Sequence, residues 1–102
     1  MEIEETKLAG LKILMPRVFA DPRGYFFESH NSRAFDKAVG EEVAFAQDNE
    51  SFSQKNVLRG MHYQTPPYAE IKLLTCITGR IYDVLVDLRP TSPTYRQWTS
   101  IV

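Results

Sequence analysis

The sequence predicts an all-β fold, an antiparallel sandwich or barrel that contains one short helix. Segments with strand composition follow one another through residues 43–102, and clusters of proline, glycine and serine separate them. Only residues 31–39 carry apolar side chains at helical spacing. Because no helices lie between the strand segments, an antiparallel architecture is favoured over a parallel α/β sheet. The length of 102 residues corresponds to one domain.

The first elements are two strands joined by a tight turn. Residues 11–19 form an apolar run that Pro16 interrupts, which predicts an edge strand because proline cannot donate to a sheet ladder. Residues 21–24 (DPRG) predict a turn, since the proline fixes φ and the glycine tolerates a positive φ. The aromatic residues of 25–29 predict the strand that follows.

A helix is predicted from Asn31 to Val39. Phe35 and Val39 lie four positions apart and share one helix face. Asn31 or Ser32 is expected to cap the N-terminus, and Gly40 is expected to end the helix in a left-handed conformation.

Five strands are predicted after the helix, over Val43–Asn49, Val57–His62, Ile71–Thr78, Arg80–Leu88 and Tyr95–Val102. Turns are expected at residues 65–67, 78–80 and 90–93, and the turn at 78–80 is short enough for a hairpin. A closed barrel of about eight strands needs more chain than this. Residues 1–102 are therefore expected to form a single, partial domain, whose open edge near residues 98–102 pairs with a second chain.

Composition narrows the classes of partner and compartment. Twelve basic and thirteen acidic residues give a net charge of −1 without a basic block, so nucleic acid is not expected as a partner. The only cysteine, Cys76, cannot form an internal disulfide, which favours the cytoplasm. The start of the chain lacks the features of a signal peptide, and no apolar run approaches the length of a membrane span. A soluble cytoplasmic protein is expected.

One polar face is predicted from alternation alone. Gln47, Asn49, Ser51 and Ser53 occupy alternate positions, so a β conformation places their side chains on one face. Either this is a solvated strand face, or it is a polar wall inside a barrel that holds a polar ligand.

The densest group of chemically useful side chains lies in residues 59–64 (RGMHYQ). Imidazole, with an ordinary pKa of about 6.5, suits proton transfer near neutral pH. His62 is thus either a general base or an ordinary histidine at a strand end. Arg59 and His62 have opposite parity, so both can face one cavity only if the strand bends, and Gly60 would tolerate a bulge there.

A lysine is expected to need an anionic partner. Lys72 shares parity with apolar neighbours on its predicted strand, and an unpaired buried ammonium is costly. Asp83 or Asp87 on the following strand can pair with it across the sheet, as a structural ion pair or as part of a site. The two histidines, His30 and His62, lie far apart, so no metal site is expected. Glycine-rich phosphate loops and nucleophile elbows are absent.

Five motifs occur in order: Asp21–Glu28 (DPRGYFFE), Gln47–Ser53 (QDNESFS), Val57–Gln64 (VLRGMHYQ), Lys72, and Tyr82–Arg89 (YDVLVDLR). Each motif is weak alone, but their order and spacing together are specific. From about Leu11 to the last residue the chain resembles the dTDP-4-dehydrorhamnose 3,5-epimerase family. The resemblance implies a cupin-type jelly roll, incomplete at its C-terminus, a homodimer built partly by strand exchange, and no cofactor.

The resemblance also implies a reaction: epimerisation of dTDP-4-dehydro-6-deoxy-D-glucose at C3 and C5 to dTDP-4-dehydro-L-rhamnose, in dTDP-rhamnose biosynthesis. His62 would remove the proton next to the C4 ketone, and Lys72 and Arg59 would stabilise the enolate oxygen, as fixed cationic donors do in a dry pocket. Asp83 would keep the lysine charged. The implied substrate-binding residues are Arg23, Glu28, Gln47 and Asn49.

The sequence departs from the family in two respects. Glu70 stands where many members have glutamine, which adds a carboxylate on the face of Lys72. The family's proton-donating tyrosine and its histidine-orienting aspartate lie in a C-terminal half that is missing here, and Tyr63, Tyr82 and Tyr95 do not match the tyrosine motif. Alternatives are a non-catalytic or truncated sugar-nucleotide-binding cupin, an epimerase of one carbon of a related sugar, and a structural β subunit.

Overall fold

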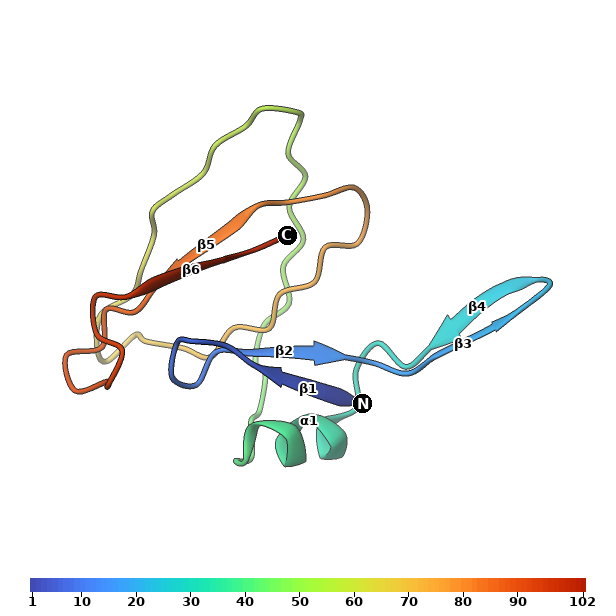
Figure 1. Ribbon diagram of the computed structural model, residues 1–102, viewed down its shortest axis with the longest axis horizontal. Helices are drawn as coiled ribbons and strands as arrows, with labels where there is room; N and C mark the ends of the chain where they lie inside the picture. The colour runs from blue at the N-terminus through green and yellow to red at the C-terminus, as the bar shows by residue number, and fades with distance from the viewer. The chain divides into compact units, whose positions relative to one another are not determined.

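A computed structural model describes residues 1–102, in which six short strands and one short helix are joined by long irregular segments (Figure 1). The elements are β1 (Glu2–Glu5), β2 (Lys12–Met15), β3 (Val18–Asp21), β4 (Gly24–Phe27), α1 (Ser32–Val39), β5 (Asp83–Val86) and β6 (Trp98–Ile101). The strands form three separate two-stranded antiparallel sheets, β1–β2, β3–β4 and β5–β6, rather than one barrel wall. The chain divides into two units, residues 1–44 with 82–102, and residues 45–81.

The β3–β4 hairpin confirms the turn predicted at residues 21–24. Asp21 pairs with Gly24 at the end of the ladder, and the Asp21 carboxylate accepts a hydrogen bond from the backbone N–H of Arg23 at 2.8 Å. Gly24 has a φ of 135°, a conformation that favours glycine. The apolar run at 11–19 is two strands rather than one, because β2 ends at Met15, just before Pro16, and β3 begins after it.

The β1 strand was not predicted. Its sequence, EIEE, is rich in glutamate, a residue depleted from strands, and all four of its residues are exposed. It forms because β2 supplies a complete antiparallel partner, with Glu2 opposite Met15 and Glu5 opposite Lys12. The side chains of Glu5 and Lys12 also form an ion pair, with 3.2 Å between Lys12 Nζ and Glu5 Oε1.

Helix α1 has both predicted caps. The Asn31 side chain accepts a hydrogen bond from the backbone N–H of Ala34 at 3.1 Å, which satisfies a donor that the first turn leaves free. Gly40 ends the helix at φ 83° and donates to the carbonyl of Asp36 at 2.9 Å. The buried face consists of Phe35 and Ala38.

The apolar core of the first unit is small. Leu8, Phe35 and Ala38 are its buried apolar residues. Leu8 lies in the β1–β2 loop, where the Thr6 hydroxyl closes the loop by donating to the carbonyl of Leu11 at 2.9 Å. Lys12 Nζ also donates to the carbonyl of Ala38 at 3.2 Å, so the helix end is tied to β2.

The β5–β6 hairpin replaces the hairpin expected at residues 78–80. Asp83 pairs with Ile101 and Val86 with Trp98, so the partner of β5 follows it in sequence and is not the 71–78 segment before it. Two further backbone bonds extend the ladder, from Asp87 N to the carbonyl of Gln97 at 2.9 Å and from Arg96 N to the carbonyl of Asp87 at 2.7 Å. The predicted strands at 80–88 and 95–102 are therefore real but shorter.

Residues 45–81 contain no strand, so the strands predicted at 43–49, 57–62 and 71–78 are wrong for this chain. A strand exists only where a neighbour completes its hydrogen bonds, and this segment has no such neighbour. Its apolar side chains are consequently exposed, Phe52 to 84%. The turn predicted at 65–67 is present, with Tyr68 N donating to the carbonyl of Thr65 at 2.8 Å.

The accessible surface of the whole chain also shows that many side chains lack packing partners. Its accessible surface is 9563 Å², whereas a folded monomer of 11.7 kDa has about 5,900 Å². Much apolar surface therefore has no partner within these residues. No helix of the chain has the length and apolar character to cross a membrane.

Candidate functional site

The predicted site residues belong to both units of the chain. Arg23, Glu28 and Asp83 lie in the unit formed by residues 1–44 and 82–102, and Gln47, Asn49, Arg59, His62 and Lys72 lie in residues 45–81. The structure therefore defines two partial groups of site residues, one in each unit.

The polar face predicted from alternation contributes two contacts within residues 45–81. Gln47 Nε2 donates to Asn49 Oδ1 at 3.3 Å, although the stretch is not a strand. Arg59 reaches the same stretch: its Nε donates to Ser53 Oγ at 2.9 Å and its Nη2 donates to the carbonyl of Phe52 at 3.0 Å. These two bonds fix the guanidinium of Arg59 beside the polar face.

The backbone between Arg59 and His62 departs from a strand conformation. Gly60 has a φ of 119°, in the region that residues with a side chain rarely adopt. A bend at this glycine is what a shared cavity for Arg59 and His62 requires, and the cavity itself stays a prediction. Both side chains are exposed, so residues 45–81 do not enclose them unaided.

Lys72 has a partner other than the expected aspartates. Its Nζ lies 3.8 Å from Glu70 Oε1, and the two side chains are 58% and 53% exposed. An ion pair this exposed stabilises the fold by about 0–1 kcal/mol. The carboxylate of Asp87, the other aspartate considered, accepts hydrogen bonds from Arg89, Ser92 and Thr94, and its pairing with Lys72 stays a prediction. The pairing with Asp83 stays a prediction.

Arg23 stands at the turn of the β3–β4 hairpin. Its Nη2 lies 2.7 Å from Asp21 Oδ2, and its side chain is 91% exposed. The hydrogen bonds from Arg23 lower the pKa of the Asp21 carboxyl and the carboxylate raises the pKa of Arg23, so both groups are charged over the physiological range. Glu28 follows the last residue of β4 and is exposed. The hairpin thus presents a fixed cation and a carboxylate to the solvent.

A dense cluster of hydrogen bonds surrounds Asp87, a residue that the sequence suggested only as a partner of Lys72. Asp87 Oδ1 accepts from Arg89 N at 3.0 Å and from Arg89 Nε at 2.9 Å. Its Oδ2 accepts from Arg89 Nη2 at 3.0 Å, from Ser92 Oγ at 2.5 Å and from Thr94 Oγ1 at 2.7 Å. The Asp87 side chain is only 2% exposed. The signal in the sequence was the loop pattern DLRPTSPT, an aspartate followed by nearby donors.

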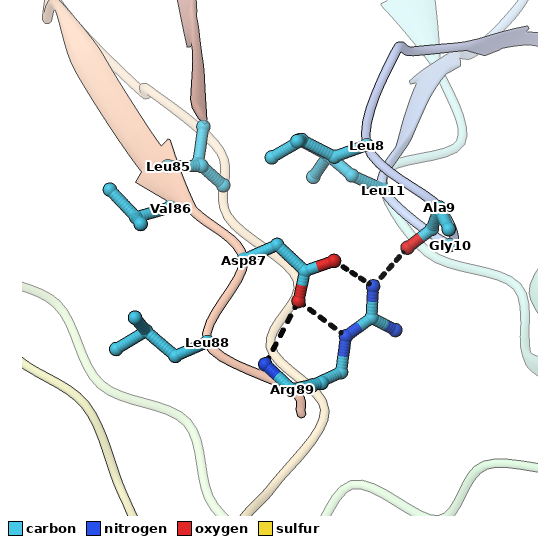
Figure 2. Close-up of a pocket in the computed structure, with 9 residues that line it drawn as sticks. All are labelled: Leu8, Ala9, Gly10, Leu11, Leu85, Val86, Asp87, Leu88 and Arg89. Atoms are coloured by element: carbon cyan, nitrogen blue, oxygen red, sulfur yellow. Dashed lines mark hydrogen bonds and ion pairs between the residues drawn. The ribbon is translucent and has the colours of Figure 1, made fainter. Parts of the chain in front are cut away.

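These donors favour the charged carboxylate strongly. The Arg89 hydrogen bonds, followed by those from Ser92 and Thr94, hold the pKa of Asp87 far below its usual range. A pocket of about 280 Å³ lies next to the cluster, lined by residues 8–11 and 85–89 (Figure 2). No group of three or more His, Cys, Asp or Glu side chains is placed to hold a metal ion.

The sequence of this chain is similar to known proteins over nearly its whole length. A model of the dTDP-4-dehydrorhamnose 3,5-epimerase family matches residues 5–102. The dTDP-4-dehydrorhamnose 3,5-epimerase of Shigella flexneri is 48% identical over 101 residues, which are 99% of this chain and 56% of that protein. The chain spans about half the length of the curated relatives it matches.

Two solved structures have the same fold over nearly all of the chain. The crystal structure of dTDP-4-dehydrorhamnose 3,5-epimerase from Elizabethkingia anophelis NUHP1 is 42% identical, with a TM-score of 0.91 over 99% of this chain and 55% of its own. The enzyme from Bacillus anthracis str. Ames, solved with TDP and PPi bound, is 42% identical, with a TM-score of 0.90 over 98% of this chain and 57% of its own. These matches include residues 45–81, despite the lack of strands there.

Proposed function

The chain belongs to the dTDP-4-dehydrorhamnose 3,5-epimerase family, and from this we propose that it carries the proton-abstracting face of an epimerase site. The observation that carries the proposal is the match of the family model to residues 5–102. The motif residues Arg59, His62 and Lys72 all fall inside that match. The proposed substrate is dTDP-4-dehydro-6-deoxy-D-glucose, and the proposed product is dTDP-4-dehydro-L-rhamnose.

Each epimerisation is a proton removal and a proton return. The imidazole of His62 takes the proton from the carbon next to the C4 ketone, and the electron pair of that C–H bond moves into an enolate on the C4 oxygen. Lys72 and Arg59 donate to this oxygen, where negative charge develops. Return of a proton to the opposite face of the carbon gives the epimer. The bonds from Arg59 to Ser53 and to the Phe52 carbonyl support this role, because a guanidinium fixed beforehand needs little rearrangement in the transition state.

The nucleotide sugar is proposed to bind through Arg23, Glu28, Gln47 and Asn49. The relative from Bacillus anthracis was solved with TDP and PPi bound, which supports a dTDP-sugar as the ligand. Arg23 offers a charged guanidinium of the kind that pairs with phosphate oxygens, and the contact between Gln47 and Asn49 offers neutral donors and acceptors for a sugar. Asp83, at the start of β5, is proposed to keep Lys72 charged.

The site is proposed to be completed by further chain and by a second copy. The accessible surface of the chain is 9563 Å². A folded monomer of this mass has about 5,900 Å², so the observed surface is larger by more than half. The apolar side chains of residues 45–81 need a covering, and unpaired backbone there needs strand neighbours. We propose a homodimer formed partly by strand exchange, with the proton donor and the histidine-orienting carboxylate outside the residues described here.

The test is solvent deuterium exchange at C3 and C5 of the 4-keto sugar, which requires the base and not the complete turnover. The proposal expects exchange with the wild type and its loss in His62→Ala by about 10²-fold or more. His30→Ala is the matched control, since it removes the other histidine, and it should retain exchange. Binding of the nucleotide sugar without exchange indicates a non-catalytic binding protein, and no binding indicates a structural subunit. Exchange at one carbon only indicates an epimerase of a related sugar.

A further inference from the structure

The Asp87 cluster makes contacts that reach beyond its own loop. The Thr94 hydroxyl, which donates to Asp87, also accepts a hydrogen bond from the backbone N–H of Ala9 at 3.0 Å. Arg89 Nη2, which donates to Asp87, also donates to the carbonyl oxygen of Ala9 (Figure 2). The two donors that Asp87 orients therefore hold both polar backbone groups of one residue in the β1–β2 loop.

The fit between the two loops is close. A side chain at Gly10 would place its first carbon 3.4 Å from Arg89 Nη1, and the φ of 80° at Gly10 itself favours glycine. Beside this contact Leu8 and Leu11 line one side of the pocket and Leu85 lines the other (Figure 2). The polar contacts with Ala9 thus lie next to the apolar wall of this pocket.

Asp87 is also part of the β5–β6 ladder. Its N–H donates to the carbonyl of Gln97 at 2.9 Å, and its carbonyl accepts from Arg96 N at 2.7 Å. The same residue therefore continues the ladder with its backbone and holds the β1–β2 loop with its side chain. Asp83 stands at the other end of β5, four residues away, which is about 13 Å along a strand.

We propose that Asp87 is a positioning residue: through Arg89 and Thr94 it locks the Ala9 peptide to the loop after β5 and so sets the direction of β5 and the place of Asp83. This role rests on the function proposed above, in which Asp83 acts on Lys72. A carboxylate with five donors has one arrangement that satisfies them all, and this makes it suitable for fixing a strand.

The first test measures the lock itself, in the full-length protein. Thr94→Val removes the hydroxyl between Asp87 and Ala9 at nearly constant volume, and Thr94→Ser retains it. Thr91→Val is the matched control, because Thr91 lies in the same loop and makes none of these bonds. We expect the Ala9 amide to exchange with solvent about fivefold to tenfold faster in Thr94→Val, as for the loss of one hydrogen bond. Both other variants should keep the wild-type rate, and an unchanged Ala9 rate in Thr94→Val would refute the lock.

The second test separates positioning from stability. At a temperature where every variant is folded, Thr94→Val should lower kcat for epimerisation about tenfold to hundredfold and change KM by less than about threefold, because the substrate contacts remain. Thr94→Ser should restore kcat. Faster exchange at Ala9 with an unchanged kcat would overturn the positioning role. A wild type without activity would refute the proposed function and the positioning role together, and the Ala9 amide would still decide whether the lock exists.

Discussion

Phe35 on helix α1 offers the sharpest test of how the first unit is held together. Its side chain is 5% exposed and is one of three buried apolar residues. A phenylalanine buries about 150–250 Å², which at about 25 cal/mol per Å² corresponds to about 4–6 kcal/mol as an upper estimate. Measured Phe-to-Ala substitutions in cores cost about 3–5 kcal/mol. We therefore expect Phe35→Ala to lower the free energy of unfolding by about 3–5 kcal/mol.

This loss is large against the total. A chain of this length (102 residues) has a stability of about 5–15 kcal/mol, and a core of three buried residues places it near the lower limit. In urea unfolding followed by circular dichroism, with a slope of about 1–3 kcal/mol per molar, the midpoint should fall by at least about 1 M.

A matched control makes the result decisive. Phe52→Ala removes the same atoms from a side chain that is 84% exposed in this chain, so in the monomeric chain of residues 1–102, where no second copy covers it, its effect should stay within about 0.5 kcal/mol. If Phe35→Ala shifts the midpoint no more than Phe52→Ala does, the helix is not packed against the first unit as described.

Two further predictions concern single polar groups. Asn31→Ala removes the bond to the Ala34 N–H and should destabilise the chain by about 1 kcal/mol in urea unfolding, whereas Asn31→Asp should retain most of that stability. The lowered pKa of Asp87 means that the folded state prefers the carboxylate, so its contribution is complete above the unfolded pKa of about 3.9 and is lost as the pH falls toward the folded pKa. The free energy of unfolding between pH 5 and pH 2 should therefore fall less steeply in Asp87→Asn than in the wild type, and equal slopes would contradict this.

The sequence by itself determined the features whose bonds are local. The hairpin turn at residues 21–24 and the helix caps at Asn31 and Gly40 depend on hydrogen bonds between residues two to four positions apart. The proline, glycine and asparagine that make those bonds possible are visible in the sequence. The family was also recognisable, because its motifs are ordered along the chain.

Tertiary structure decided everything that depends on a distant partner. Strand composition at residues 57–62 and 71–78 was not sufficient for strands, because a strand needs a neighbour, while β1 formed from glutamates because β2 provided one. The contacts of the Asp87 cluster with Ala9 join residues about eighty positions apart. Composition and periodicity describe what each segment can bury or bond, but a hydrogen bond forms only between groups that the fold brings within about 3 Å of each other.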